Sequence, residues 1–252
     1  MNRPESAVPR PTDVYFFATC VVDQFFPGAG MDAITLLEHQ GIRVHFPEEQ
    51  TCCGQPAYTS GFPDEARKVA AQQLTLYPEN WPVVVPSGSC AGMMKHHYPT
   101  LFAADPARKA QAEALSVRIY ELTDFLVNVL DFQPQDTGSD CTVVLHTSCS
   151  ARREMGVHLT GRKLLDGLGK VKVALQDHES ECCGFGGTFS VKFGEVSAAI
   201  AERKCDFIHA SGAPAVVGGD LGCLLNIEGK LRRMGDEKTQ VLHVAEVLAG
   251  RV

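Results

Sequence analysis

Eight cysteines stand in two sets of four with nearly the same spacing. The first set is Cys20, the adjacent pair Cys52-Cys53, and Cys90; the second is Cys149, the adjacent pair Cys182-Cys183, and Cys223. A glycine, Gly54 or Gly184, follows each pair, and equivalent cysteines lie 129 to 133 residues apart. The spacing therefore predicts that the chain consists of two tandem copies of one unit. Because thiolates are soft ligands, two such sets predict metal chemistry.

The arrangement of the cysteines bears on which metal they bind. Structural zinc sites usually draw their ligands from C-x2-C knuckles, and neither half contains one. An adjacent Cys-Cys pair suits a polynuclear cluster, because neighbouring thiolates can bind different irons. Four cysteines can supply the four ligands of a four-iron–four-sulfur (4Fe-4S) cluster. The ligand chemistry favours such clusters, and zinc and a redox-active disulfide remain alternatives. Two further cysteines, Cys141 and Cys205, lie in apolar patterns and are interpreted as small buried hydrophobic side chains.

The composition narrows the class of protein. The chain has 252 residues, 44% of them hydrophobic and 21% charged, which is typical of a globular protein with a real core. A net charge of −7 without a basic run argues against a nucleic-acid partner. No apolar stretch approaches the ~20 residues that span a bilayer, and the N-terminus lacks the apolar core of a signal peptide. We expect a cytoplasmic protein with reduced thiols and no transmembrane segment.

Hydrophobic periodicity predicts alternating strands and helices. Short β-branched or aromatic runs predict buried strands at 14–20, 42–46, 82–90, 142–149, 170–175 and 214–223. Apolar residues at three-to-four spacing predict helices at 31–40, 63–77, 121–130, 161–169, 192–210 and 242–248. The expected fold class is α/β, with two tandem pseudo-repeated domains, each a small parallel sheet flanked by helices.

The stretch 131–140, rich in turn formers and charge, is the predicted linker. The expected parts are a disordered tail at 1–12, an N-terminal domain at 13–135 and a C-terminal domain at 136–252. In each half two cysteines end predicted strands and the adjacent pair follows another. The carboxyl ends of parallel strands meet at one edge of a sheet, where such folds bind ligands. We therefore expect each set of four to converge on one pocket, and all eight cysteines to be metal ligands.

Six segments resemble the cysteine-rich CCG domain family. They are ATCVVDQFFPGAG (18–30), TCCGQPAYTSG (51–61), PSGSCAGMM (86–94), HTSCSARREMG (146–156), ECCGFGGTFSVK (181–192) and HVAEVL (243–248). The family's pattern, a cysteine, then Cys-Cys-Gly, then Cys-x-x-Cys, occurs twice in one of the subunits of heterodisulfide reductases. It also occurs in the iron–sulfur subunits of glycolate oxidase and anaerobic glycerol-3-phosphate dehydrogenase. The present chain is most similar to the short members that serve lactate utilization.

The resemblance implies a duplicated α/β fold, iron–sulfur binding and a part in oxidising L-lactate to pyruvate. It also implies other lactate utilization subunits as partners, including a ferredoxin-like iron–sulfur protein. The expected function is an iron–sulfur electron-transfer subunit with one or two 4Fe-4S clusters. The alternatives are a non-catalytic scaffold stabilised by zinc, with zinc in one half as a mixed case, a thiol or heterodisulfide reductase, and a glycolate oxidase iron–sulfur subunit.

Four other residues are candidates beside the cysteines. Ser87 and Asp220 stand where the family's pattern has the first cysteine of Cys-x-x-Cys, a departure that favours ordinary four-iron clusters over the larger noncubane ones. Asp220 is a candidate oxygen ligand, with a helix cap or a contact behind the ligands as the alternative. His146 is a candidate for proton handling, or a buried histidine satisfied by the backbone. Arg152 is a candidate for binding a substrate carboxylate, or for offsetting cluster charge.

Overall fold

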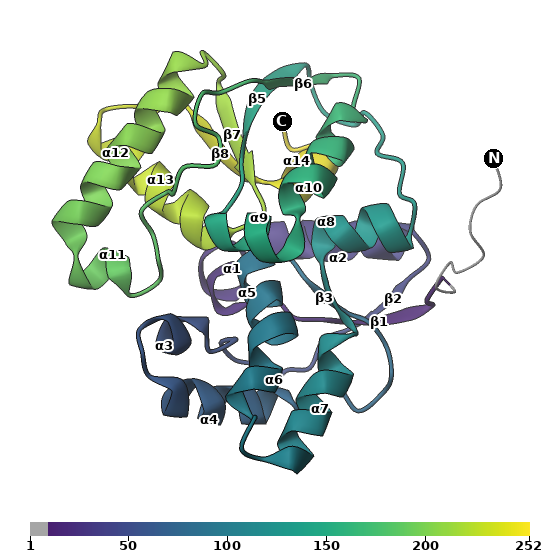
Figure 1. Ribbon diagram of the computed structural model, residues 1–252. Coiled ribbons are helices and arrows are strands. Elements are labelled where there is room, and N and C mark those ends of the chain that lie inside the picture. The colour runs from purple at the N-terminus through teal and green to yellow at the C-terminus, as the bar shows by residue number, and fades with distance from the viewer. Residues whose placement is uncertain (1–9) are drawn as a thin grey trace, which may run out of the picture.

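The computed structural model describes residues 10–252 (Figure 1). Most of the predicted tail, residues 1–9, lies outside the described residues. At the end of that tail, the carbonyl of Thr12 accepts a hydrogen bond from the Arg43 N–H at 2.8 Å. The Arg10 guanidinium donates to the Gln40 carbonyl, also at 2.8 Å.

Strands and helices alternate through both halves of the chain. The first half contains β1 (Asp13–Phe16), α1 (Cys20–Phe25), α2 (Pro27–His39), β2 (Arg43–His45), α3 (Gln55–Thr59), α4 (Pro63–Gln73), β3 (Val83–Val85), α5 (Gly88–Gly92), a π-helical turn η1 (Met93–His97), α6 (Tyr98–Leu101), α7 (Pro106–Ser116), β4 (Ile119–Glu121), α8 (Leu122–Asp124) and a second π-helical turn η2 (Phe125–Val129). The second half contains β5 (Cys141–His146), α9 (Cys149–Met155), α10 (Val157–Asp166), β6 (Val171–Ala174), α11 (Phe189–Lys192), α12 (Gly194–Ala210), β7 (Ala215–Gly218), α13 (Leu221–Arg233), β8 (Gln240–His243) and α14 (Val244–Leu248). Between η2 and β5, residues 130–140 form no regular element.

Each half contains a four-stranded parallel sheet. The strand orders are β2-β1-β3-β4 and β6-β5-β7-β8, so the second sheet repeats the first. The register repeats as well, because Phe16 pairs with Val84 in one sheet and Leu145 with Val217 in the other. The predicted fold class, tandem pseudo-repeated α/β units with parallel sheets, is confirmed.

The structure corrects the predicted strands in two respects. It adds a fourth strand to each sheet, β4 and β8, where the sequence predicted only the helices at 121–130 and 242–248. Each is three or four residues long and runs directly into α8 or α14, so its period of two is too short to stand out from the helical pattern. The strands predicted to end on cysteines stop earlier, at Phe16, Val85, His146 and Gly218.

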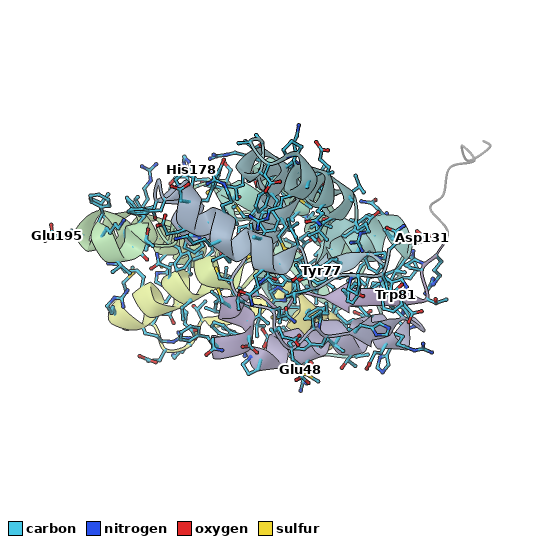
Figure 2. All side chains as sticks on the ribbon, turned by 90° about the horizontal axis from the view of Figure 1, so that it is seen from below. Glu48, Tyr77, Trp81, Asp131, His178 and Glu195 are labelled. Carbon is cyan, nitrogen blue, oxygen red and sulfur yellow. The ribbon has the colours of Figure 1, made fainter. Side chains whose placement is uncertain are left out.

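The two halves share one hydrophobic core. It joins residues of both sheets, such as Phe16 and Leu145, with apolar residues of α2, α10 and α14. Helix α14 of the second half packs on α2 of the first, and α10 of the second half packs on α8 of the first (Figure 1). Because α14 is the equivalent of α8 and α10 that of α2, the two contacts are equivalent. Seen from below, Glu195 of α12 lies at one end of the molecule and Asp131 at the other (Figure 2). Among the described residues, no helix is both long and apolar enough to cross a membrane.

Candidate metal centres

The first set of cysteines comes together at the carboxyl edge of the first sheet. Cys20 is the first residue of α1, Cys52 and Cys53 lie in the loop between β2 and α3, and Cys90 lies in the first turn of α5. The Sγ atoms of Cys53 and Cys90 are 3.3 Å apart. Cys52 makes side-chain hydrogen bonds with both Cys20 and Cys53, so the four thiols form a continuous chain of contacts.

The second set repeats this arrangement. Cys149 opens α9, the pair Cys182-Cys183 lies in the loop before α11, and Cys223 lies in the first turn of α13. The thiol contacts run from Cys149 to Cys182, from Cys182 to Cys183 and from Cys183 to Cys223. The sequence predicted that Cys149 and Cys223 end strands, whereas the structure places both in the first turn of a helix. Convergence survives this correction because the first turn of a helix that follows a parallel strand lies at the same edge of the sheet.

The thiols of each set polarise one another. The pKa of Cys52 is lowered to about 3 and that of Cys182 to about 2. Each accepts hydrogen bonds from two neighbouring thiols of its set, and each also accepts one from the N–H of the glycine two residues later, at 3.4 and 3.3 Å. The donating thiols of Cys20 and Cys149 have their pKa raised, since they gain a partner only while protonated and are partly buried. A bound cation would replace the shared protons and let the remaining thiols ionise.

Glycines shape the loop that carries each pair. Gly54 and Gly184 have φ of 86° and 84°, in the left-handed region that favours glycine. A Cβ on Gly184 would lie 2.5 Å from the Ser197 carbonyl oxygen of α12. The absence of a side chain therefore lets the cysteine pair lie directly against the helix behind it.

Both sets of cysteines lie in segments of the chain that match a known protein family. The family model described as the CCG cysteine-rich domain matches the chain twice, over residues 14–95 and 143–228. The chain belongs to the CCG cysteine-rich domain family. Each matched segment, a CCG repeat below, holds one complete set of four cysteines.

Two relatives of nearly the same length are similar to this chain over most of its residues. Lactate utilization protein A of Geobacillus kaustophilus (strain HTA426) is 42% identical over 238 residues, which cover 94% of this chain and 99% of that protein. Lactate utilization protein A 2 of Bacillus cereus (strain 03BB102) is 42% identical over 236 residues, covering 94% and 97%.

A solved structure has a similar fold. It is the crystal structure of a hypothetical protein from Helicobacter pylori, with a TM-score of 0.65 and 12% sequence identity. The match covers 94% of this chain and 48% of that one, so the present chain spans about half the length of that protein. At this identity the likeness shows the fold alone.

Ser87 and Asp220, the residues that depart from the family's cysteine pattern, meet each other between the two CCG repeats. The Ser87 hydroxyl donates to Asp220 Oδ1 at 2.8 Å, and the Ser89 N–H donates to the same oxygen at 3.0 Å. Asp220 stands at the N-cap position of α13, yet its side chain makes no hydrogen bond to that helix. It instead binds an N–H in the first turn of α5, the equivalent helix of the other repeat.

Arg152, the candidate for substrate binding, is already engaged. Its guanidinium forms an ion pair with Glu179 at 2.5 Å and donates to the Thr147 hydroxyl at 3.1 Å. The guanidinium is about a quarter exposed, 28% by side-chain area, and it fixes the loop before the second cysteine pair against α9.

His146, the other candidate beside Cys149, is 2% exposed. Burial lowers the pKa of its imidazole to about 3, and the charges of Lys204 and Arg152 act in the same direction. Neither ring nitrogen has a hydrogen-bond partner among the described residues. The structure therefore holds a neutral imidazole whose polar atoms no protein group satisfies.

Sequence reasoning missed two buried charged residues near the centres. Lys204 of α12 is fully buried, and its ammonium donates to the Glu179 carbonyl at 2.9 Å. Glu121, which ends β4, is fully buried too, and its Oε2 accepts from the N–H of Thr123 at 2.7 Å. No signal marked either one, because a lysine in an amphipathic helix and a glutamate before a helix are both typical of the surface.

Glu121 and His146 line one small cavity between the two halves of the chain. Its volume is about 10 Å³, close to the smallest that can hold a water molecule. Glu121 Oε1 has no hydrogen-bond partner within residues 10–252, just as the His146 nitrogens have none. Residues with unsatisfied polar atoms, one from each half of the chain, therefore line the same cavity.

Replacing Glu121 by glutamine is expected to flatten the dependence of stability on pH. Burial raises the pKa of Glu121 to about 7, from an ordinary value of 4.5. Between these two pH values the Glu121 carboxyl is ionised in the unfolded chain but still protonated in the folded one. The carboxyl's contribution to stability, present below pH 4.5, is thus lost as the pH rises to about 7. A loss of about 3 kcal/mol corresponds to this shift.

Glutamine keeps an acceptor for the Thr123 N–H and has no charge at any pH. The Glu121→Gln protein should therefore unfold at a higher denaturant concentration than wild type near pH 8, and at a similar concentration near pH 4. Equilibrium unfolding measures both. If the variant and wild type differed in stability by the same amount at pH 4 and pH 8, Glu121 would not have a raised pKa in the folded protein.

Proposed function

We propose that this chain is an iron–sulfur electron-transfer subunit of a complex that oxidises L-lactate to pyruvate. The observation that carries the proposal is the gathering of four thiols at the carboxyl edge of each sheet. Lactate utilization proteins of the same length, 42% identical, support the lactate assignment. The proposed metal ligands are Cys20, Cys52, Cys53 and Cys90 in the first CCG repeat, and Cys149, Cys182, Cys183 and Cys223 in the second.

The donor set fits a cluster. All ten cysteines are free, so no disulfide competes for the eight sulfurs. Backbone N–H groups of Gly54, Gly184 and Phe185 donate to cysteine sulfurs at 3.3 to 3.4 Å, the kind of contact that tunes cluster potentials. An iron–sulfur cluster, when bound, accepts and donates one electron at a time. Lys204, buried beside the second set, provides a positive charge that favours the more electron-rich state of whatever that set binds.

Exposure gives each set an inner and an outer side. Cys53 and Cys183 are 2% and 3% exposed, whereas Cys182 is exposed and Cys52 is half-buried. Electrons can therefore enter or leave on the side of Cys52 and Cys182, where a partner protein can approach. In this proposal lactate is oxidised on a companion protein, and a ferredoxin-like lactate utilization protein exchanges electrons with the exposed side. The free thiols agree with a cytoplasmic setting.

Metal and sulfide analysis of anaerobically purified protein tests the proposal. The expected content is about eight irons and about eight sulfides per chain, with broad visible absorption that dithionite bleaches. Stoichiometric zinc without sulfide in both repeats would instead favour the zinc-stabilised scaffold.

Zinc in the second repeat alone is a specific alternative. Among residues 10–252, one group of three possible metal ligands has donor atoms that all lie within 4.8 Å of one another. It consists of His146, Cys183 and Cys223. A mixed nitrogen and sulfur set of this kind also suits a single zinc ion. About four irons and about one zinc per chain would be the result for this mixed case.

A further inference from the structure

The two CCG repeats have different residues three positions before their first cysteine. His146 ends β5 and pairs with Gly218, one residue beyond the pairing of Leu145 with Val217. The register of the first sheet, in which Phe16 pairs with Val84, places Phe17 at the equivalent position. Both residues are buried, at 2% and 0% exposure. The first repeat therefore has a hydrocarbon side chain where the second has an imidazole.

An imidazole in this position is unfavourable unless it binds something. A buried polar group without a hydrogen-bond partner destabilises the folded state, and Phe17 shows that an apolar side chain suits the equivalent position. Neither nitrogen of His146 has a hydrogen-bond partner in the described part of the chain. A donor atom of the ring lies within 4.8 Å of the sulfurs of Cys183 and Cys223. The side chain is thus directed at the thiols of the second set.

His146 also lies beside a small cavity with polar residues in its lining. His146 lines the small cavity that also contains Glu121 and Thr147. Histidines that bind metals nearly always donate their second ring N–H to a carboxylate, a carbonyl or a water molecule. Glu121 Oε1, which has no hydrogen-bond partner among the described residues and belongs to a residue that lines the same cavity, can supply such an acceptor through one water molecule.

We propose that His146 is a nitrogen ligand of the metal centre in the second CCG repeat. The inference rests on the proposed function only in requiring a metal there, and it holds for iron or zinc. The first centre is then bound by four thiolates. The second is bound by three thiolates and the imidazole, so one cysteine of the second set is not a ligand. In iron–sulfur proteins histidine in place of cysteine raises the reduction potential. The buried charge of Lys204 acts in the same direction, whereas the first repeat has the neutral Gln73, also fully buried, in the equivalent helix α4. Electrons are thus drawn from the first centre to the second.

Pulsed electron paramagnetic resonance on dithionite-reduced protein tests the assignment. Wild type should show strong nitrogen coupling to the cluster spin, and the coupling should change from the ¹⁴N to the ¹⁵N pattern when only histidine is ¹⁵N-labelled. In His146→Phe, which copies the first repeat, this coupling should disappear. In His39→Phe, at an exposed position in the last turn of α2, it should persist. If His146→Phe does not fold, the labelled wild type decides alone.

A redox titration adds a second readout. Wild type should titrate at two potentials, and only the higher one should move downward in His146→Phe. If the second repeat binds zinc, X-ray absorption at the zinc edge should show a nitrogen ligand in wild type that is lost in the variant. Full iron content without histidine coupling would overturn the ligand assignment and leave the proposed function intact. Protein without iron or zinc would overturn both.

Discussion

Replacing Cys183 by serine is expected to remove the metal from the second CCG repeat and leave the first repeat loaded. Iron should fall from about eight to about four per chain, because a serine hydroxyl stays protonated near neutral pH and is a poor ligand for a soft metal. Cys183 is 3% exposed and contacts both Cys182 and Cys223, so the change removes the thiol at the buried centre of the second set. Growth on L-lactate of a strain whose only copy carries the change should be lost, and growth on pyruvate should be kept.

The chain offers a matched control in the same hydrophobic cluster. Cys205 is fully buried and packs with Cys183, but its thiol contacts only the Ile227 carbonyl, at 3.7 Å. Cys205→Ala should keep all of the iron and growth on lactate, with a stability loss of about 1 kcal/mol from the small cavity. Cys53→Ser should mirror Cys183→Ser and empty the first repeat. Full iron in Cys183→Ser, or equal loss in Cys205→Ala, would remove the thiols from the proposed ligand set.

Replacing Asp220 by alanine is expected to lower the free energy of unfolding by about 2–4 kcal/mol. Asp220 is 4% exposed and its carboxylate accepts from the Ser87 hydroxyl and the Ser89 N–H, so its removal takes this acceptor from one buried and one half-buried donor. These bonds join the repeats where α5 packs closely on α9. A Cβ on Gly88 would collide there with the side chain of Ala151. The midpoint of thermal unfolding should fall by roughly 5–10 °C.

Two companion variants separate this role from metal binding. Asp220→Asn keeps an acceptor oxygen and should lose less than half as much stability as Asp220→Ala. Ser87→Ala with Asp220→Ala should be less destabilising than the sum of the single changes, because the two side chains contact each other. Iron content should stay near the wild-type value in all three. Loss of iron with an unchanged unfolding temperature would make Asp220 an oxygen ligand instead.

Much of the fold follows from local pattern. Runs such as the valines of β3 and the apolar spacing of α12 predict a strand and a helix without reference to the rest of the chain. The strands β4 and β8 could not be predicted in this way, because each is stabilised by pairing with β3 or β7 rather than by its own few residues. Tertiary pairing outweighs local preference where an element is that short.

For the candidate metal centres too, some features could be predicted from the sequence and others could not. The repeated spacing of Cys20, Cys52-Cys53 and Cys90, and the parallel α/β units in which these cysteines lie, could be predicted from the order of residues alone. Strand–helix alternation with repeated spacing brings equivalent positions to one edge of each sheet. The contact of Ser87 with Asp220 could be seen only in the folded chain, as could the position of His146 beside Cys183 and Cys223 with no hydrogen-bond partner in residues 10–252. The physical reason is that the Ser87–Asp220 contact joins residues 133 positions apart. Contacts at such separation depend on how complete sheets and helices pack, and no local pattern of residues encodes that packing.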